Sequence, residues 1–506
     1  MGKASKPLVL LVPGLRSLAV WRTHSSRLFL MSKVDYYDDT APAPAVDEAV
    51  LAKLATRSSL TPDSAKLILV MVGLPARGKS FISSKLQSFL QWSGKRTQIF
   101  NAGQKRRQDS SPDLQSIERQ TSSAKFFDPS DAGAKAQREA IAMETLEALL
   151  QWFEQEGGDV GILDATNSTR DRRAAVVARA AAESARTGES VAVVFIESVC
   201  DEAALLEANM LAKVRASPDF KGLSEADALA DLKERIGHYE RQYETVEDQE
   251  GAYIKLFNLS SKVAANQVFG RMSQRVLPYL AALHIRPRPI YLAALLPGAG
   301  EAARSSDSSF AHKLAHFATV RATAGENLRL LSSTQPAALA AADAIGCTVT
   351  HQSGLNPLDR GRTMGDGDAS SPAVEALLAR MKFDERFPGG GESFADLVRR
   401  LWPCVLEIEA SMEPVLVLAH AGPCRALRAY FKNLHVVECM GAATSPGSQA
   451  LANHSHKVVS LVPNINSGGF VETIIDLEDG PVASTPLGIS AVMGAPGLDG
   501  AYGDLS

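Results

Sequence analysis

Residues 66–80 read Lys66-Leu-Ile-Leu-Val-Met-Val-Gly-Leu-Pro-Ala-Arg-Gly-Lys-Ser80. The apolar run at its start is typical of a strand buried on both faces of a parallel sheet. Gly73 to Ser80 then fits the pattern G-x-x-x-x-G-K-[ST] at every position, and helical periodicity follows it. Because strand, loop and helix come in the order that phosphate binding requires, the stretch predicts a phosphate loop in preference to a chance glycine-rich turn.

The residue types in this loop have separate tasks. Successive backbone N–H groups face the phosphates, Lys79 reaches the β- and γ-phosphate oxygens, and Ser80 supplies a hydroxyl ligand for Mg²⁺. The sequence therefore predicts binding of ATP or GTP. The residues expected to contact the nucleotide are Gly73, Leu74, Pro75, Ala76, Arg77, Gly78, Lys79 and Ser80.

A carboxylate follows the next predicted buried strand, Val160 to Leu163. Asp164 opens the stretch Asp164-Ala-Thr-Asn-Ser-Thr-Arg-Asp-Arg172. At the carboxyl end of a parallel strand, such a side chain can hold Mg²⁺ or orient an attacking hydroxyl. Asp is also a favoured helix N-cap, and alone the two interpretations are about equal. Beside a phosphate loop, the functional interpretation is favoured.

The rest of the chain alternates predicted strands and helices, which indicates parallel α/β sheets. A helical segment at 134–156 precedes Val160, a third strand is expected at 191–196, and Gln108 to Ala124 is expected to be a mobile serine-rich insertion. Arg286-Pro-Arg-Pro289 is the clearest internal boundary, with later strands at 290–296 and 415–419. We expect an N-terminal, partly disordered extension, two α/β domains and a flexible tail, at 1–63, 64–285, 286–476 and 477–506.

Composition excludes several classes of protein. The 506 residues contain 53 Lys and Arg against 57 Asp and Glu, so no overall basic field points to nucleic acid. No apolar run reaches the roughly 18 residues of a membrane span. The five cysteines form no CxxC pair, which favours reduced thiols over a zinc site and indicates a cytoplasmic protein.

Beyond the phosphate loop, several motifs follow in order. They are Phe100-Asn-Ala-Gly-Gln-Lys-Arg-Arg107, Phe126-Phe-Asp-Pro129, Asp164-Ala-Thr-Asn167, Phe195-Ile-Glu-Ser-Val-Cys200, Ser217-Pro-Asp219, Arg235-Ile-Gly-His-Tyr239 and Asn266-Gln-Val268. Over about residues 63–476 the chain resembles the 6-phosphofructo-2-kinase/fructose-2,6-bisphosphatase family. The resemblance implies a phosphate-loop kinase domain with a mainly parallel sheet, followed by a histidine-phosphatase-like α/β domain.

The resemblance also implies roles for individual residues. ATP would bind at Gly73 to Ser80 and near Asn209, with Asp164 as the catalytic aspartate associated with Mg²⁺. The positions that would bind fructose 6-phosphate are Arg106, Arg138, Thr166, Arg172, Arg235 and Tyr239. Guanidinium groups suit this substrate because they form paired contacts with phosphate oxygens. Any one of these arginines could instead lie on a solvated helix face.

Three positions in the first domain need comment. The family has a lysine three residues before Ser-Pro-Asp, where this chain has Val214, with Lys213 one position earlier. One residue rotates a helical side chain by about 100°, so Lys213 is a candidate only if its length compensates. Lys105 replaces a family tyrosine. Cys200 matches a family cysteine near the nucleotide, although a buried structural thiol explains it equally well.

The second domain departs from the chemistry that the resemblance implies. The family has Cys-Arg-His-Gly-Glu after the first strand, whereas this chain places Ala294 at the arginine and Leu295 at the nucleophilic histidine. Leucine has no lone pair that could attack phosphorus. Pro357 replaces the proton donor, and Ala337 falls at a further phosphate-binding arginine. His420 matches the family's second histidine and is expected to be structural or vestigial.

These observations predict a 6-phosphofructo-2-kinase that uses ATP and Mg²⁺, with Ser80 and Asp164 as metal ligands and an inactive phosphatase half. A bifunctional kinase/phosphatase and a nucleotide-binding regulatory module without turnover are the alternatives. The sequence does not give the oligomeric state; members of the family commonly dimerise, so the resemblance makes a homodimer possible. Phosphorylation of Ser110 or Ser111, beside Arg106 and Arg107, is a hypothesis for inhibition, because it adds negative charge near the sugar-phosphate arginines.

Overall fold

The computed structural model describes most of the chain from residue 65 to residue 477. The described ranges are 65–108, 124–259, 262–268, 270–284, 286–295, 301–361, 372–441, 446–451, 457–463 and 470–477, with three strands nearer the N-terminus. The predicted insertion with Ser110 and Ser111, and the predicted tail beyond 477, lie outside these residues. Within the described part, no helix is long and apolar enough to cross a membrane.

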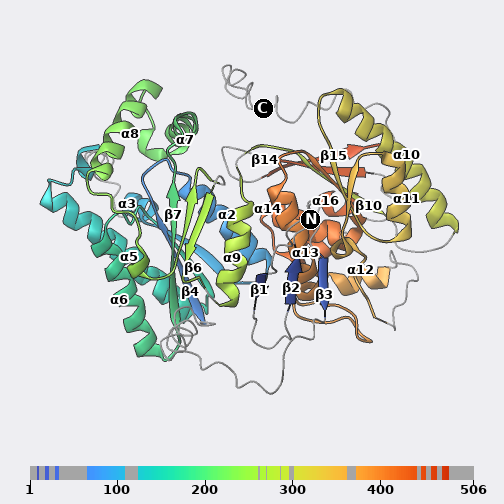
Figure 1. The fold of residues 1–506 in the computed structure, drawn as a ribbon, viewed down its shortest axis with the longest axis horizontal. Coiled ribbons are helices and arrows are strands. Elements are labelled where there is room, and N and C mark those ends of the chain that lie inside the picture. Colours follow the sequence, from blue (N-terminus) through green and yellow to red (C-terminus); the bar gives the residue numbers. More distant parts are fainter. Residues whose placement is uncertain are drawn as a thin grey trace, which may run out of the picture. The chain divides into compact units, whose positions relative to one another are not determined.

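The chain divides into two compact units, residues 1–56 and 57–506. The first contains an antiparallel sheet of β1 (Leu8–Leu10), β2 (Leu18–Trp21) and β3 (Phe29–Ser32). The second contains two six-stranded sheets, one in each half of the unit (Figure 1).

The first sheet has the strand order β5-β6-β4-β7-β8-β9. All neighbouring pairs are parallel except β8 and β9, which confirms a mainly parallel sheet. The strands are β4 (Lys66–Val72), β5 (Thr97–Asn101), β6 (Val160–Asp164), β7 (Val191–Val199), β8 (Tyr253–Phe257) and β9 (Lys262–Asn266). The helices are α2 (Lys79–Trp92), α3 (Ala102–Gln108), α5 (Ala132–Gln155), α6 (Arg170–Thr187), α7 (Ala203–Ala216), α8 (Glu225–Glu240) and α9 (Arg271–Ala282), with short 3₁₀ turns η1 (Ala124–Phe127), η2 (Pro218–Phe220) and η3 (Asp248–Glu250).

Strand β4 shows why its sequence is apolar throughout. Its alternate side chains enter two different cores, because successive side chains of a strand point to opposite faces. Leu67, Leu69 and Met71 pack with α2 and α9, whereas Ile68 and Val70 pack with α5 and α6. Figure 1 shows these two pairs of helices on opposite sides of the sheet. In the strand order β4 lies between β6 and β7. The phosphate loop, which begins at the carboxyl end of β4, therefore starts from an inner strand of the sheet and not from its edge strands.

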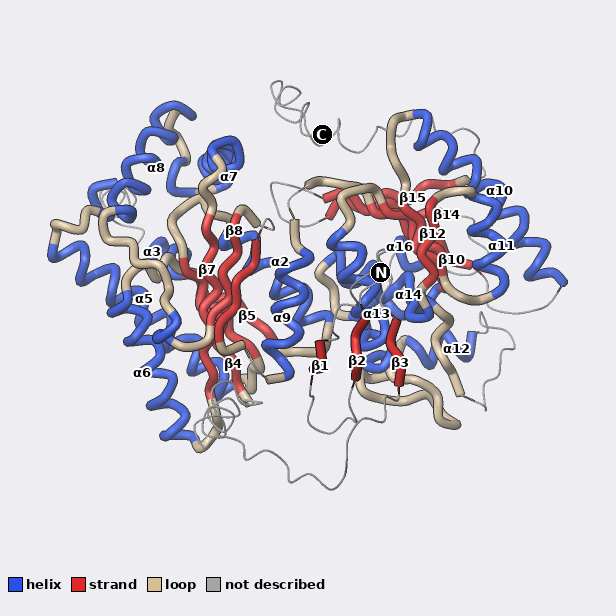
Figure 2. The backbone as a smooth tube through the Cα atoms, viewed as in Figure 1, coloured by secondary structure: helices blue, strands red, loops and turns tan. Residues whose placement is uncertain are grey.

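The second sheet has the order β12-β11-β13-β10-β14-β15, parallel from β12 to β10 and antiparallel beyond. Figure 2 shows the strands of this sheet in red. The strands are β10 (Ile290–Leu295), β11 (Arg329–Ser332), β12 (Thr348–His351), β13 (Val415–His420), β14 (Lys457–Pro463) and β15 (Phe470–Asp476). The helices are α10 (Glu301–Thr323), α11 (Pro336–Ile345), α12 (Pro372–Leu378), α13 (Phe394–Ala410), α14 (Ala421–Lys432), α15 (Val436–Met440) and α16 (Pro446–Ala450), with the 3₁₀ turn η4 (Ser353–Leu355).

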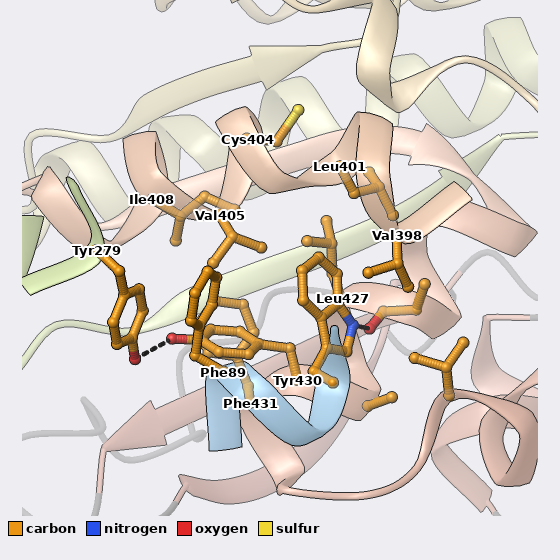
Figure 3. Close-up of a cluster of buried hydrophobic side chains, with 14 of the residues drawn as sticks. Phe89, Tyr279, Val398, Leu401, Cys404, Val405, Ile408, Leu427, Tyr430 and Phe431 are labelled. Carbon is orange, nitrogen blue, oxygen red and sulfur yellow. Dashed lines mark hydrogen bonds between the residues drawn. The ribbon is translucent and has the colours of Figure 1, made fainter. Parts of the chain in front are cut away.

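One hydrophobic core continues from the first half of this unit into the second. It includes Leu69 of β4, Leu86 of α2, Leu401 of α13 and Leu427 of α14. Figure 3 shows the region where α2 meets the second half. The indole Nε1 of Trp92 donates to the carbonyl of Ala426 at 2.8 Å across this boundary. The two halves are therefore packed together through an ordinary protein interior and not through a solvated linker.

Candidate active site

The phosphate loop between β4 and α2 has the backbone geometry that its glycines suggest. Gly73 has φ +140°, and a Cβ there would lie 2.6 Å from the carbonyl oxygen of Ser198. A side chain is therefore excluded on both conformational and steric grounds. The N–H of Gly73 donates to the carbonyl of Thr166 at 3.0 Å, which ties the loop to the segment after β6.

Lys79 is the first residue of α2 and is buried. Its Nζ donates to the carbonyl of Leu74 at 2.7 Å, so the ammonium group is held across the loop. Burial lowers the pKa of Lys79 to about 7, which Asp164 opposes and Lys213 and Arg77 reinforce. A phosphate bound beside Lys79 would favour the protonated form and raise this pKa.

Asp164 is the last residue of β6, and its Oδ2 accepts two hydrogen bonds. One comes from the Ser80 hydroxyl at 2.9 Å and the other from the Asn101 amide at 2.6 Å. Thr169, and not Asp164, is the N-cap of α6, so the capping interpretation of Asp164 is wrong. The carboxylate and hydroxyl are oxygen donors of the kind that Mg²⁺ prefers, and the pair fits that ion.

No role is predicted for Asn101 from the sequence. It lies opposite Asp164 in the parallel register of β5 and β6, so both side chains leave the carboxyl edge of the sheet. Its place in the Phe100-to-Arg107 motif, at the end of a strand, was the available signal.

A cavity of about 570 Å³ lies above this edge of the sheet. It collects the predicted site residues with two exceptions, Gly73 and Leu74, which lie in the loop without lining the cavity. The predicted residues that line it are Pro75, Ala76, Arg77, Gly78, Lys79, Ser80, Arg106, Arg138, Asp164, Thr166, Arg172, Asn209, Lys213, Arg235 and Tyr239. Lys105, at the position of a family tyrosine, instead pairs with Glu144 at 3.5 Å.

In the wall of the cavity, a single carboxylate contacts three arginines. Oδ2 of Asp219 accepts from Arg106 at 2.5 Å and from Arg235 at 3.0 Å, and its Oδ1 accepts from Arg107 at 3.3 Å. Burial opposes ionisation of Asp219, but Arg106 and Arg235 outweigh burial, and the pKa of Asp219 is lowered. The role of Asp219 was also missed, although the Ser217-Pro-Asp219 motif contains it.

Two more arginines of the cavity are held by different acceptors. Arg138 donates to the carbonyls of Phe126 and Asp128, the latter at 3.4 Å. Arg172 makes a paired contact with Glu139 at 2.8 and 2.5 Å. Neither side chain therefore lies on a solvated helix face. Protein acceptors therefore orient both guanidinium groups, which suits recognition of a multivalent anion.

Helix α7 explains how the lysine shift is accommodated. Val214 packs into a small apolar cluster with Phe220 and Leu232, whereas Lys213 lines the cavity. Surrounding protein lowers the pKa of Lys213, with Asp164 and Asp219 acting in the opposite sense. The Nδ2 of Asn209 is buried at the same wall and has no hydrogen-bond partner among the described residues. Such a donor is suited to a ligand atom.

The comparisons with known proteins agree with this geometry. Residues 56–287 match the 6-phosphofructo-2-kinase family, and residues 315–457 match branch 1 of the histidine phosphatase superfamily. The 6-phosphofructo-2-kinase/fructose-2,6-bisphosphatase of Gallus gallus is 33% identical over 399 residues, or 75% of this chain and 81% of the relative. The chain belongs to the 6-phosphofructo-2-kinase/fructose-2,6-bisphosphatase family.

Two further 6-phosphofructo-2-kinase/fructose-2,6-bisphosphatase relatives, both of form 3, are similar to the chain. The Homo sapiens protein is 33% identical over 72% of this chain and 70% of its own length. The Rattus norvegicus protein is 32% identical over 72% of this chain and 65% of its own length. The matched first domain indicates an enzyme of the 6-phosphofructo-2-kinase class.

The phosphatase-like half places the substituted family positions as follows. Leu295 ends β10, is buried among apolar side chains, and lies opposite His420 in the register of β10 and β13. Neither ring nitrogen of His420 has a hydrogen-bond partner among the described residues. Burial lowers the pKa of His420 to about 4, and the Leu295 backbone, which acts in the opposite sense, does not offset this. Ala294 packs against the shared core, and Pro357 supplies a carbonyl to Arg400 at 2.9 Å.

Cys200 follows β7 and is buried. Burial raises the pKa of its thiol, with the nearby Arg77 acting in the opposite sense. A buried thiol with a raised pKa is a poor nucleophile, so no covalent role is assigned to Cys200.

Proposed function

We propose that this chain is a 6-phosphofructo-2-kinase that transfers the γ-phosphoryl group of ATP to the 2-hydroxyl of fructose 6-phosphate. The observation that carries the proposal is the cavity in which the phosphate loop faces the arginines gathered by Asp219. The residues of the loop suit a nucleoside triphosphate, and the arginines suit a sugar phosphate. The products would be ADP and fructose 2,6-bisphosphate.

The residues of the cavity would act mainly through position and charge. The bond from the sugar O2 to the γ-phosphorus forms, the bond from that phosphorus to the β,γ-bridging oxygen breaks, and the hydroxyl proton is released. Lys79 would neutralise charge on the transferring group, while Arg106 and Arg235 hold the 6-phosphate. Ser80 and Asp164 would hold Mg²⁺, which when bound neutralises charge on the β- and γ-phosphates.

A coupled assay of ADP release, with and without fructose 6-phosphate, tests this function. ADP release that depends on fructose 6-phosphate, together with formation of fructose 2,6-bisphosphate, supports it. ATP binding without sugar-dependent turnover would instead identify a nucleotide-binding regulatory module. That alternative is disfavoured by the buried arginines, which a nucleotide alone does not require.

We also propose that the phosphatase half has no fructose-2,6-bisphosphatase activity, unlike what the names of the relatives state for them. Three substitutions support this: Leu295, Ala294 and Pro357 each lack the group that catalysis requires. The superfamily match begins at residue 315, after the strand that would carry the nucleophile. Ala337 likewise offers no cation.

We propose a cytosolic protein, because all five cysteines are unpaired, as expected in a reducing compartment. A homodimer remains a prediction from the family.

A further inference from the structure

Helix α2 connects the phosphate loop to the second half of the unit. Its first residues, Lys79 and Ser80, belong to the loop. Lys85 follows six residues after Lys79, about 9 Å along the helix axis. The Nζ of Lys85 lies 3.1 Å from Oε1 of Glu409, which belongs to α13 of the phosphatase-like half. One short rigid element therefore has the candidate nucleotide site at one end and the other half of the unit against its side.

Glu409 is the centre of a buried polar network. It is 2% exposed and accepts from the Tyr430 hydroxyl at 2.6 Å, with Arg288 at 3.9 Å. Burial would raise the pKa of Glu409, but Lys85 and Arg288 outweigh burial and the pKa is lowered. The carboxylate is thus charged and depends on cations from two different segments. A buried charge that loses such a partner is strongly destabilised, so small displacements are resisted.

Two tyrosines extend this network to the backbone of α2. Because Tyr430 donates its only proton to Glu409, Tyr279 must donate in the contact between the two hydroxyls, which is 2.8 Å long. The Tyr279 hydroxyl also lies 3.0 Å from the carbonyl of Lys85, so one proton is shared between two acceptors. Glu409 is thereby connected to both the side chain and the backbone of Lys85.

Aromatic packing completes this contact, as Figure 3 shows. The ring of Phe89 stacks on Tyr279 with centroids 4.1 Å apart and planes 7° apart. Trp92, one helical turn later, donates to the Ala426 carbonyl of α14. Directional bonds along α2, at residues 85 and 92, fix its rotation as well as its distance from the second half.

We propose that Glu409 is a positioning residue for phosphoryl transfer, and that the phosphatase-like half serves as a support that fixes α2 and the phosphate loop. The expected effect of Glu409 on turnover rests on the proposed function. The expected effect of Glu409 on ATP binding is independent of the proposed function. Glu409 acts through Lys85 and does not line the cavity. The half thus has a use that requires none of the missing phosphatase groups.

The test compares Glu409→Gln and Lys85→Met with a matched control, Glu407→Gln. Glu407 lies on the same helix but pairs with Arg329 inside the second half, away from α2. All variants are studied in the full chain, well below the unfolding temperature of the least stable one. The measurements are the dissociation constant of MgATP without sugar, amide hydrogen exchange over residues 73–80, and KM and kcat separately.

We expect Glu409→Gln and Lys85→Met each to weaken ATP binding by about tenfold and to speed exchange in the loop, whereas Glu407→Gln does neither. The double variant should bind ATP about as weakly as either single variant, because both changes remove one interaction. A lower melting temperature with unchanged ATP affinity and loop exchange would overturn the inference. If Glu409→Gln does not fold, Lys85→Met and Tyr430→Phe carry the same comparison.

These outcomes separate the inference from the proposed function. If the wild-type protein binds ATP but shows no sugar-dependent turnover, the proposed function is wrong. Weaker ATP binding in Glu409→Gln would then still support the inference that the second half fixes the phosphate loop. Conversely, wild-type kinase activity with identical ATP affinity in all variants retains the proposed function and removes this inference.

Discussion

The Ser80 hydroxyl donates to Oδ2 of Asp164 at 2.9 Å, which joins the start of α2 to the end of β6. This hydrogen bond joins residues 84 positions apart in the sequence at the candidate metal site. Because these two candidate oxygen ligands of Mg²⁺ are already in contact, ion binding would require little rearrangement of the chain.

Asp164→Ala should reduce turnover by at least about 10²-fold, because it removes the carboxylate that organises charge at the transferring phosphoryl group. ATP affinity should fall much less, since the loop backbone and Lys79 remain. Steady-state kinetics and ATP titration measure the two effects. Near-normal turnover in a folded variant would contradict the assignment.

Lys79→Met should abolish kinase activity and also remove a pH dependence of ATP binding. Burial lowers the pKa of Lys79 to about 7, and bound phosphate would raise it, so binding above pH 7 should take up a proton. The dissociation constant of ATP should therefore increase with pH above 7, by up to about tenfold per pH unit.

Calorimetry in buffers of different ionisation enthalpy should show proton uptake of about one at pH 8 for the wild type. The exposed control Lys135→Met should behave the same way. Proton uptake that persists in Lys79→Met would show that another group titrates.

Asp219→Asn should raise the KM for fructose 6-phosphate by about tenfold with a much smaller effect on the KM for ATP. The carboxylate that orients Arg106 and Arg235 is replaced by an amide, and paired contacts with phosphate depend on that orientation. Added positive charge alone would lower this KM. The exposed Asp384→Asn controls for the change in net charge, and a lowered KM in Asp219→Asn alone would show that charge outweighs orientation.

Purified protein should release no phosphate from fructose 2,6-bisphosphate and form no acid-labile phosphoenzyme from radiolabelled substrate. Leu295→His should recover little, because catalytic groups act as a unit and Ala294 and Pro357 still lack theirs. If the purified protein does hydrolyse fructose 2,6-bisphosphate and Leu295→Ala retains that activity, another residue must be the nucleophile. If Leu295→Ala abolishes the activity, the alignment of Leu295 with the family's nucleophilic histidine is wrong.

The phosphate loop and the buried strands could be predicted from local patterns. The predicted strand at 66–72 corresponds to β4, and the helical segment at 134–156 corresponds to α5 within two residues at either end. Apolar runs and glycine spacing are properties of neighbouring residues, so they can be recognised in a single sequence. The prediction of which arginines bind the sugar phosphate rested on the family resemblance, since nothing in the local sequence distinguishes Arg106 from Arg107.

The partners of those residues could not be predicted. Asp219 contacts Arg106 across 113 positions, and Lys85 contacts Glu409 across 324. Neither spacing follows a helical or strand period, because tertiary packing alone creates these contacts. Asp164 shows the intermediate case: its place after a strand was evident, but its exclusion as a helix cap required the observed N-cap at Thr169.

The hydrophobic core that runs through both halves bears on how this family can change over time. Leu295 and Ala294, which stand where the family has catalytic groups, are packed among apolar side chains of the second half. Leu401 and Leu427 face the kinase half instead, and their removal would leave Leu86 and Phe89 against water. The second half can therefore lose a catalytic function while selection still preserves its fold. Truncation of the second half would expose a hydrophobic surface on the first half and make it prone to aggregation.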